Sequence, residues 1–206
     1  MKKIAVFASG SGSDFQSIID ANEREHFCEI ALLVASKEGI FAIERAKKHG
    51  IEYIVRNKKD YSSAEAMFED IIVQIQSRGI DFIVLAGYLS MIPRNFVCAF
   101  PDRIINIHPS LIPSFCGKGF YGINVHRAAL EYGVKISGLT VHFVDENYDS
   151  GAIILQRAVE VKEGDSPESL QKRILEEEHK ALPEAVKLLT TGKLVKHGRI
   201  VSIVSQ

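Results

Sequence analysis

An asparagine and a histidine stand two residues apart in RIINIHPSLIPSF, residues 103–115. If 103–107 is a strand, Asn106 and His108 project to the same side at its carboxyl end. An amide N–H can donate to a developing oxyanion, and an imidazolium can donate to it or transfer a proton, so the pair has the groups that acyl or formyl transfer needs. The alternative is that His108 is a strand-end residue whose hydrogen bonds are satisfied within the protein.

The two prolines of this segment restrict the chain that follows the strand. Pro109 and Pro113 have a fixed φ and no N–H, and they also restrict the residues before them. Such stiffness favours a segment that positions side chains.

An acidic turn occurs downstream in HFVDENYDSGAIILQ, residues 142–156. Its carboxylate candidates are Asp145, Glu146 and Asp149, and Asp149, just before a Ser-Gly pair, is the best of them. A carboxylate beside His108 would keep the imidazole protonated at neutral pH and make it a useful acid. The alternative is a solvated turn, because Asp and Asn favour turns for local hydrogen-bonding reasons.

A Gly-Ser segment, SGSGSDFQ at residues 9–16, follows the first apolar run and opens the first helical stretch. Backbone N–H groups and the helix dipole make this place suitable for a phosphate. Gly10 and Gly12 permit close approach of the backbone, but the third glycine of the dinucleotide motif and the Gly-Lys-Ser/Thr of a P-loop are missing. The alternative is a tight turn in which Ser13 caps the helix.

Other polar residues give weaker signals. His126 is expected near a helix start, where it could contact ligand or solvent, and His142 alternates along a strand and fits a packing role. Cys116 has no identifiable base beside it. The run EEEH at 176–179 fits a solvated helix face, although one of its carboxylates could turn inward.

Alternating strands and helices are expected to position these residues. Apolar runs lie at 3–8, 29–35, 53–55, 81–87 and 103–107, and stretches of helical period lie near 13–25, 40–49 and 63–78. Because the strands are continuously apolar, helices should cover both faces of a mostly parallel sheet. The pattern predicts an α/β fold with a Rossmann-like, doubly wound sheet.

The pattern changes after residue 135. ISGLTVHFV and AIILQRAVEV are long strands joined by a polar turn, which predicts an antiparallel C-terminal extension of the sheet. A long amphipathic helix follows, with Ser166 as N-cap, Pro167 at its first position and Gly192 at its end. Pro183 is expected to kink or split it. The tail could form a small hairpin.

Composition limits the class of protein. The chain has 206 residues, 46% of them hydrophobic, and a formal net charge of −1. Without a dense Lys/Arg run or an apolar membrane span, we expect no nucleic-acid or membrane partner and a cytoplasmic location. Three widely spaced cysteines argue against a disulfide framework and against a metal site. No linker or repeat is visible, so we expect one domain over 1–206.

Five segments in this order resemble the folate-dependent formyltransferases, and among them the phosphoribosylglycinamide formyltransferases. They are FASGSGSDFQSIIDA, IVLAGYLSMIP, INIHPSLIPSF, GLTVHFVDENYDSGAIILQ and EEEHKALPEAV, and the resemblance spans roughly residues 2–190. It implies transfer of the formyl group of 10-formyltetrahydrofolate to the amine of glycinamide ribonucleotide in purine biosynthesis. It also implies two small-molecule substrates, no metal, and a monomer or homodimer.

The resemblance also implies a role for each part of the chain. Residues 1–100 would form a nucleotide-binding half, 101–190 a catalytic and folate-binding half, and 193–206 a terminal extension. Asn106, His108 and Asp149 would be catalytic, with Asp149 holding His108 as imidazolium. The implied substrate-binding residues are Gly12, Ser13, Asp14, Phe15, Gln16 and Glu178, and the implied folate-binding residues are Leu89, Ser90, Met91, Ile92, Asn106, Asp145 and Asp149.

This sequence departs from the family pattern at three places. Asp14 stands where many members have Asn, and its carboxylate would be unfavourable beside a phosphate unless it turned away or capped the helix. Ser90 and Ala64 stand where an Arg is common. We hypothesise that Lys118, in a glycine-bracketed loop, replaces a lost anion contact.

Three alternatives to the implied activity stay open. The chain could formylate an amino-sugar nucleotide or another acceptor, it could hydrolyse formyltetrahydrofolate, or it could bind a nucleotide or folate without catalysis. A His108→Asn variant would separate enzyme from binding protein.

Overall fold

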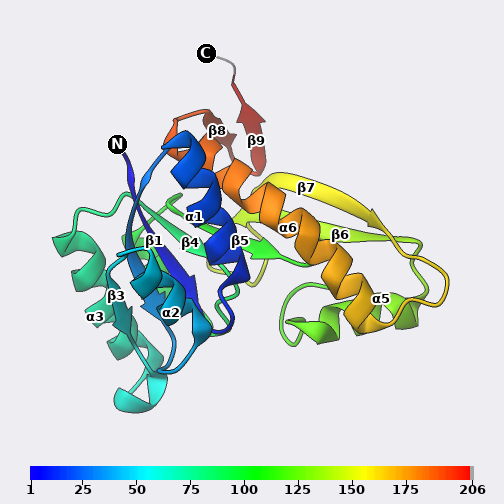
Figure 1. Cartoon of the computed structure of the whole chain (residues 1–206), viewed down its shortest axis with the longest axis horizontal. Coiled ribbons are helices and arrows are strands. Elements are labelled where there is room, and N and C mark those ends of the chain that lie inside the picture. The colour runs from blue at the N-terminus through cyan, green and yellow to red at the C-terminus, as the bar shows by residue number, and fades with distance from the viewer. Residues whose placement is uncertain (205–206) are drawn as a thin grey trace.

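A seven-stranded sheet forms the centre of the protein, as the computed structural model, which describes residues 1–204, shows (Figure 1). The strands are β1 (Lys3–Ala8), β2 (Glu29–Ala35), β3 (Tyr53–Val55), β4 (Phe82–Leu85), β5 (Ile104–His108), β6 (Ile136–Phe143) and β7 (Ile153–Glu160). Their order is β3-β2-β1-β4-β5-β6-β7. The first five strands are parallel, whereas β6 pairs antiparallel with both β5 and β7. The predicted mostly parallel sheet with an antiparallel extension is confirmed.

Helices cover both faces of the sheet, also as predicted. They are α1 (Ser13–Glu25), α2 (Phe41–Lys48), the 3-10 turn η1 (Lys58–Asp60), α3 (Ala64–Ser77), α4 (Arg94–Ala99), α5 (Ile123–Tyr132) and α6 (Pro167–Thr190). Successive residues of β1 point to opposite faces. Ile4 and Val6 pack into a core with α1, α2 and α6, whereas Ala5 and Phe7 pack with α3 and α4.

Helix α6 begins as its sequence predicts and runs without a break. The Ser166 hydroxyl accepts a hydrogen bond from the Ser169 N–H, the Ser169 hydroxyl accepts one from the Ser166 N–H, and Pro167 holds the first helical position. The expected split at Pro183 is wrong. Pro183 removes one backbone hydrogen bond, but its side chain and those of Leu182 and Ala185 are buried, and this packing keeps α6 continuous from Pro167 to Thr190.

The C-terminal strands β8 (Leu194–His197) and β9 (Ile200–Ile203) form the predicted small hairpin. Leu194 and Val201 are partly buried and pack against the core that contains the buried side chains of α6. In the described part of the chain, no helix is both long enough and apolar enough to cross a membrane.

Candidate functional site

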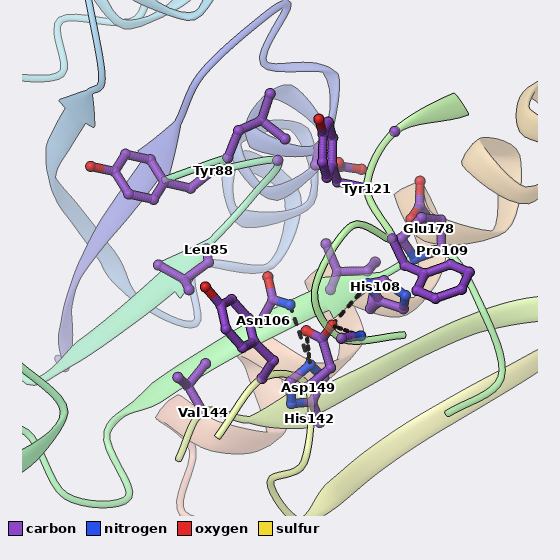
Figure 2. A pocket seen from close by; sticks show the side chains of 18 of the residues that line it. Leu85, Tyr88, Asn106, His108, Pro109, Tyr121, His142, Val144, Asp149 and Glu178 are labelled. Atoms are coloured by element: carbon purple, nitrogen blue, oxygen red, sulfur yellow. Dashed lines mark hydrogen bonds and ion pairs between the residues drawn. The ribbon is translucent and has the colours of Figure 1, made fainter. Parts of the chain in front are cut away.

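A pocket of about 790 Å³ opens at the carboxyl ends of β4 and β5 (Figure 2). Leu85, Asn106 and His108 lie at the ends of these strands and line it. The segment 87–92, the loop 117–122, the turn 144–149, the start of α1 and one face of α6 supply most of the remaining walls. Open α/β sheets bind ligands at this edge, because polar loops converge there above the buried strands.

Asn106 is paired with a histidine that sequence reasoning assigned to packing. In the antiparallel pairing of β5 with β6, Asn106 lies opposite His142, and its Nδ2 lies 3.2 Å from His142 Nε2. His142 Nδ1 lies 2.8 Å from the Phe143 carbonyl oxygen, to which it donates. Nε2 therefore accepts from the Asn106 amide. Burial lowers the pKa of His142, in agreement with a neutral ring.

This pairing fixes which way the Asn106 amide points. One of its two N–H groups is held by His142, so the amide nitrogen faces His142 and its second N–H remains for a ligand. The expectation that His142 only packs is therefore wrong. The signal that could have revealed it is the antiparallel register, which is not visible in either strand alone.

His108 is almost fully buried and lies between two partners. Its Nε2 donates to the Phe115 carbonyl oxygen at 3.0 Å, and its Nδ1 lies 3.8 Å from Asp149 Oδ2. The other oxygen of Asp149 lies 3.8 Å from His142 Nε2. Asp149 thus lies between two imidazoles, 3.8 Å from a nitrogen of each and beyond the distance of a direct hydrogen bond (Figure 2).

The turn that carries Asp149 is held at two points. Asp149 has a φ of 47°, in the left-handed region, and its Oδ2 accepts a hydrogen bond from the Gly117 N–H at 2.8 Å. At Gly151 a Cβ would lie 1.7 Å from the Phe143 carbonyl oxygen, so only glycine permits this approach. Asp145 accepts from the Ser150 hydroxyl at 2.7 Å and so stabilises the turn itself.

Two largely buried carboxyl groups line the pocket where α1 packs on α6. Burial raises the pKa of Asp14 to about 6. Burial, together with the charge of Asp14, raises the pKa of Glu178 well above its ordinary value. Asp14 Oδ1 has no hydrogen-bond partner within residues 1–204, and His179 Nε2 lies 3.7 Å from it.

Most of the residues implied by the resemblance line this pocket, but three do not. Those that do are Ser13, Asp14, Leu89, Ser90, Met91, Ile92, Asn106, His108, Asp145, Asp149 and Glu178. Gly12, Phe15 and Gln16 are not among the lining residues. The Phe15 side chain is fully buried in the core and has no surface to offer a ligand. The Gln16 amide donates to Asp20, and its side chain lines a second depression together with Ser13 and Arg45.

Gly12 has a structural reason for being glycine. Its φ is 68°, and a Cβ there would lie 2.7 Å from the Ala42 Cβ, so it permits close packing of α1 on α2. Gly12 is also the N-cap of α1, and no side chain caps this helix. The alternative in which Ser13 caps the helix is therefore wrong, because Ser13 lies inside the first turn and lines the pocket.

The pocket mouth is apolar, and its lining is rich in acids. Leu89, Met91, Tyr121 and Tyr148 are all about half exposed or more, and the Tyr148 hydroxyl lies 2.8 Å from the Met91 sulfur. The carboxylates that line the pocket are Asp14, Asp145, Glu146, Asp149, Glu168 and Glu178, whereas its lysines are Lys118 and Lys172. Lys118, the hypothesised anion contact, is thus one of the residues that line the pocket.

Neither a metal site nor a thiol nucleophile is supported by the described residues. Residues 1–204 contain no group of three or more His, Cys, Asp or Glu side chains arranged to hold a metal ion. Burial and the charge of Asp149 raise the pKa of the Cys116 thiol, which disfavours the reactive thiolate. The arrangement is suited to stabilising charge on a carbonyl oxygen.

Comparison with known proteins gives a consistent result. A family model described as formyl transferase matches residues 2–186. A phosphoribosylglycinamide formyltransferase of Arabidopsis thaliana, described as chloroplastic, is 46% identical over 90% of this chain. One of Bacillus subtilis is 41% identical over 92% of this chain and 95% of its own. The crystal structure of glycinamide ribonucleotide transformylase 1 from Symbiobacterium toebii superposes with a TM-score of 0.93 at 41% identity, covering 100% of this chain and 95% of that one.

The relatives differ in length. This chain spans 64% of the Arabidopsis protein and 95% of the Bacillus protein. Further parts of the plant protein therefore lie outside the match.

Proposed function

Since the chain belongs to the formyl transferase family, we propose that it transfers the formyl group of 10-formyltetrahydrofolate to the amine of glycinamide ribonucleotide, a step of purine biosynthesis. The observation that supports this most directly is the convergence of Asn106, His108 and Asp149 on one pocket. Relatives named for this activity match almost the whole length of the chain.

Asn106 acts on the carbonyl oxygen of the formyl group. When the amine nitrogen attacks the formyl carbon, this oxygen gains negative charge, and the free N–H of Asn106 donates to it. Because His142 already fixes the amide, little reorganisation is needed at the moment of reaction.

His108 is the second donor and carries the proton. Its Nε2–H turns from the Phe115 carbonyl oxygen to the oxyanion, while Asp149 stabilises the imidazolium. As the intermediate collapses, the bond to N10 of the folate breaks. The amine loses one proton and N10 gains one, so His108 can pass a proton without net consumption. No covalent enzyme intermediate forms.

The two substrates occupy different parts of the pocket in this proposal. The pterin of the folate lies between the apolar segment 89–92 and the turn 145–149, next to Asn106. The nucleotide lies toward α1, with Ser13 near its phosphate and Glu178 near its ribose or glycinamide end. Asp14 faces the same end as Glu178, so its carboxylate does not serve the phosphate.

An absorbance assay of tetrahydrofolate formation tests the activity. We expect product from 10-formyltetrahydrofolate only when glycinamide ribonucleotide is present. Product without the nucleotide would indicate the hydrolase alternative, and product only with an amino-sugar nucleotide would indicate a different acceptor. No turnover together with tight ligand binding would indicate a binding protein.

The remaining expectations concern the state and location of the protein. We propose that the chain acts in the cytoplasm as a monomer or homodimer, with no nucleic-acid or membrane partner. The Bacillus relative is consistent with this location, whereas plant relatives are described as chloroplastic. Size-exclusion chromatography with light scattering determines the oligomeric state.

A further inference from the structure

One buried histidine in the pocket wall has no role in the proposed reaction. His126 lies in the first turns of α5, directly after the loop 117–122, and its side chain is only 1% exposed. It nevertheless lines the same pocket as His108 and Glu178. Buried polar groups are normally hydrogen-bonded, so a buried imidazole that lines a ligand pocket without a partner needs an explanation.

Neither ring nitrogen of His126 has a partner within residues 1–204. Nδ1 is enclosed and unbonded. Nε2 makes no hydrogen bond to the protein either, but it is not enclosed, so it is the nitrogen that opens to the pocket. An orphaned N–H is rarer in proteins than an orphaned acceptor. The favoured tautomer therefore keeps the lone pair at Nδ1 and presents an N–H at Nε2.

The ring stays uncharged under physiological conditions. Burial, and then the nearby His108, lower the pKa of His126 to about 4. Its neutral N–H therefore remains a donor at neutral pH. A neutral donor suits an uncharged ligand oxygen better than a phosphate, which would favour a protonated ring.

We propose that His126 Nε2 donates a hydrogen bond to the carbonyl oxygen of the glycinamide amide, next to the reacting amine. This inference rests on the proposed function. His126 lines the same pocket as His108, close enough for the charge of His108 to lower its pKa, so the ring lies near the reacting end of the substrate. That end carries an amine and an amide carbonyl. The lone pair of the amine must face the formyl carbon. The amide carbonyl oxygen is therefore the acceptor that remains for the N–H of His126.

Three substitutions at His126 test the contact. The amide nitrogen of Gln can reach the place of Nε2, that of Asn the place of Nδ1, and Leu has neither donor. We expect His126→Leu and His126→Asn to raise the KM and Kd for glycinamide ribonucleotide about 10- to 100-fold, because a ligand carbonyl is left unpaired. His126→Gln should remain within about threefold of the wild type, and the KM for the folate should not change.

A thioamide analogue of the nucleotide distinguishes a direct contact from a structural effect. Sulfur accepts hydrogen bonds weakly, so the wild type should bind the analogue more weakly than the natural ligand. His126→Leu should bind the two ligands almost equally in titration calorimetry. His197→Leu, in the exposed hairpin strand β8, is the control and should change nothing.

The outcomes separate the two proposals. If the wild type forms no tetrahydrofolate with glycinamide ribonucleotide, the proposed function fails. If the wild type is active and His126→Leu keeps the wild-type KM, or loses equal affinity for both ligands, the role of His126 is refuted. If His126→Leu does not fold, comparison of the Gln and Asn variants decides, because equal KM values for these two would also refute it.

Discussion

The two ends of the pocket differ in how their polar groups are satisfied. At the β5 end, which comprises Asn106, His108, His142 and Asp149, each side chain has a partner in the protein. At the α6 end, which comprises Asp14 and Glu178, two acids are buried together and Asp14 Oδ1 has no donor.

This difference indicates which end of the pocket stabilises the transition state and which end recognises the substrate. Groups that stabilise a transition state are most effective when the protein fixes them in advance. Groups that recognise a substrate can remain unpaired, because the ligand supplies the missing donors and the unpaired state favours binding. Changes at the β5 end should therefore alter kcat, and changes at the α6 end should alter binding and stability.

The largest effect is expected at His108. His108→Asn removes the proton carrier, so kcat should fall by roughly 10²- to 10⁴-fold. Binding of both ligands should stay within about tenfold, as titration calorimetry would show. If His108→Asn mainly weakened ligand binding and left kcat unchanged, the assignment of catalysis to the β5 end would be wrong.

A smaller loss of kcat is expected at His142. His142→Leu removes the acceptor for Asn106, and the freed amide can rotate. We expect kcat to fall about 10- to 100-fold, less than for loss of an oxyanion donor itself, with both KM values nearly unchanged. His142→Gln, which keeps an acceptor at the place of Nε2, is the matched variant and should restore most of kcat. Equal kcat values for His142→Leu and His142→Gln would contradict the proposal that the hydrogen bond to His142 fixes the Asn106 amide.

The α6 end predicts a pH-dependent stability. The pKa of Asp14 is raised from 3.8 to about 6 in the folded protein, so the native state binds protons more tightly than the unfolded chain. The stability associated with Asp14 is fully present below pH 4 and is lost as pH rises through about 6. Asp14→Asn should therefore stabilise the protein at pH 8 by up to about 3 kcal/mol and should change little at pH 4.

Urea unfolding at these two pH values measures this effect. Asp20→Asn, on the exposed side of α1, is the control and should show no such difference. Some pH dependence should persist in Asp14→Asn, because Glu178 also has a raised pKa. A variant that is destabilised at pH 8 would show that Asp14 is paired with a cation.

The smallest effect is expected at Lys118. Lys118→Ala removes one of the two lysines that line the pocket, and both proposed substrates are anionic. We expect the KM of one substrate to rise about 3- to 10-fold, and the rise to shrink at high salt. Lys180→Ala, whose lysine pairs with Glu177 on α6, is the control. The hypothesis fails if both KM values remain unchanged.

The fold could be predicted largely because apolar periodicity reports burial. Residues 3–8 and 29–35 form strands as predicted, since each is buried on both faces of the sheet. Helix α4 was not predicted, because its six residues are too few to show a helical period. The unbroken α6 also differs from expectation, because core packing around Pro183 outweighs the local cost.

Site residues on one strand could be predicted, but those that depend on pairing could not. Asn106 and His108 face one side through the strand period alone. His142 is recognised only from the pairing of β5 with β6, which joins residues 36 positions apart. Phe15 was placed in the site only through the family resemblance, but its position on α1 faces the core.

The register between β5 and β6 limits where this chain can change in length. Inserting one residue in β6 ahead of His142 would turn the imidazole to the opposite face of the sheet, and Asn106 would lose its hydrogen-bond acceptor. Residues 118–122 lie in the connection between β5 and β6, so a change in their number does not alter the register of the two strands. Related chains should therefore gain or lose residues in this loop while keeping β6 intact, and loop grafts here offer a route to altered substrate preference.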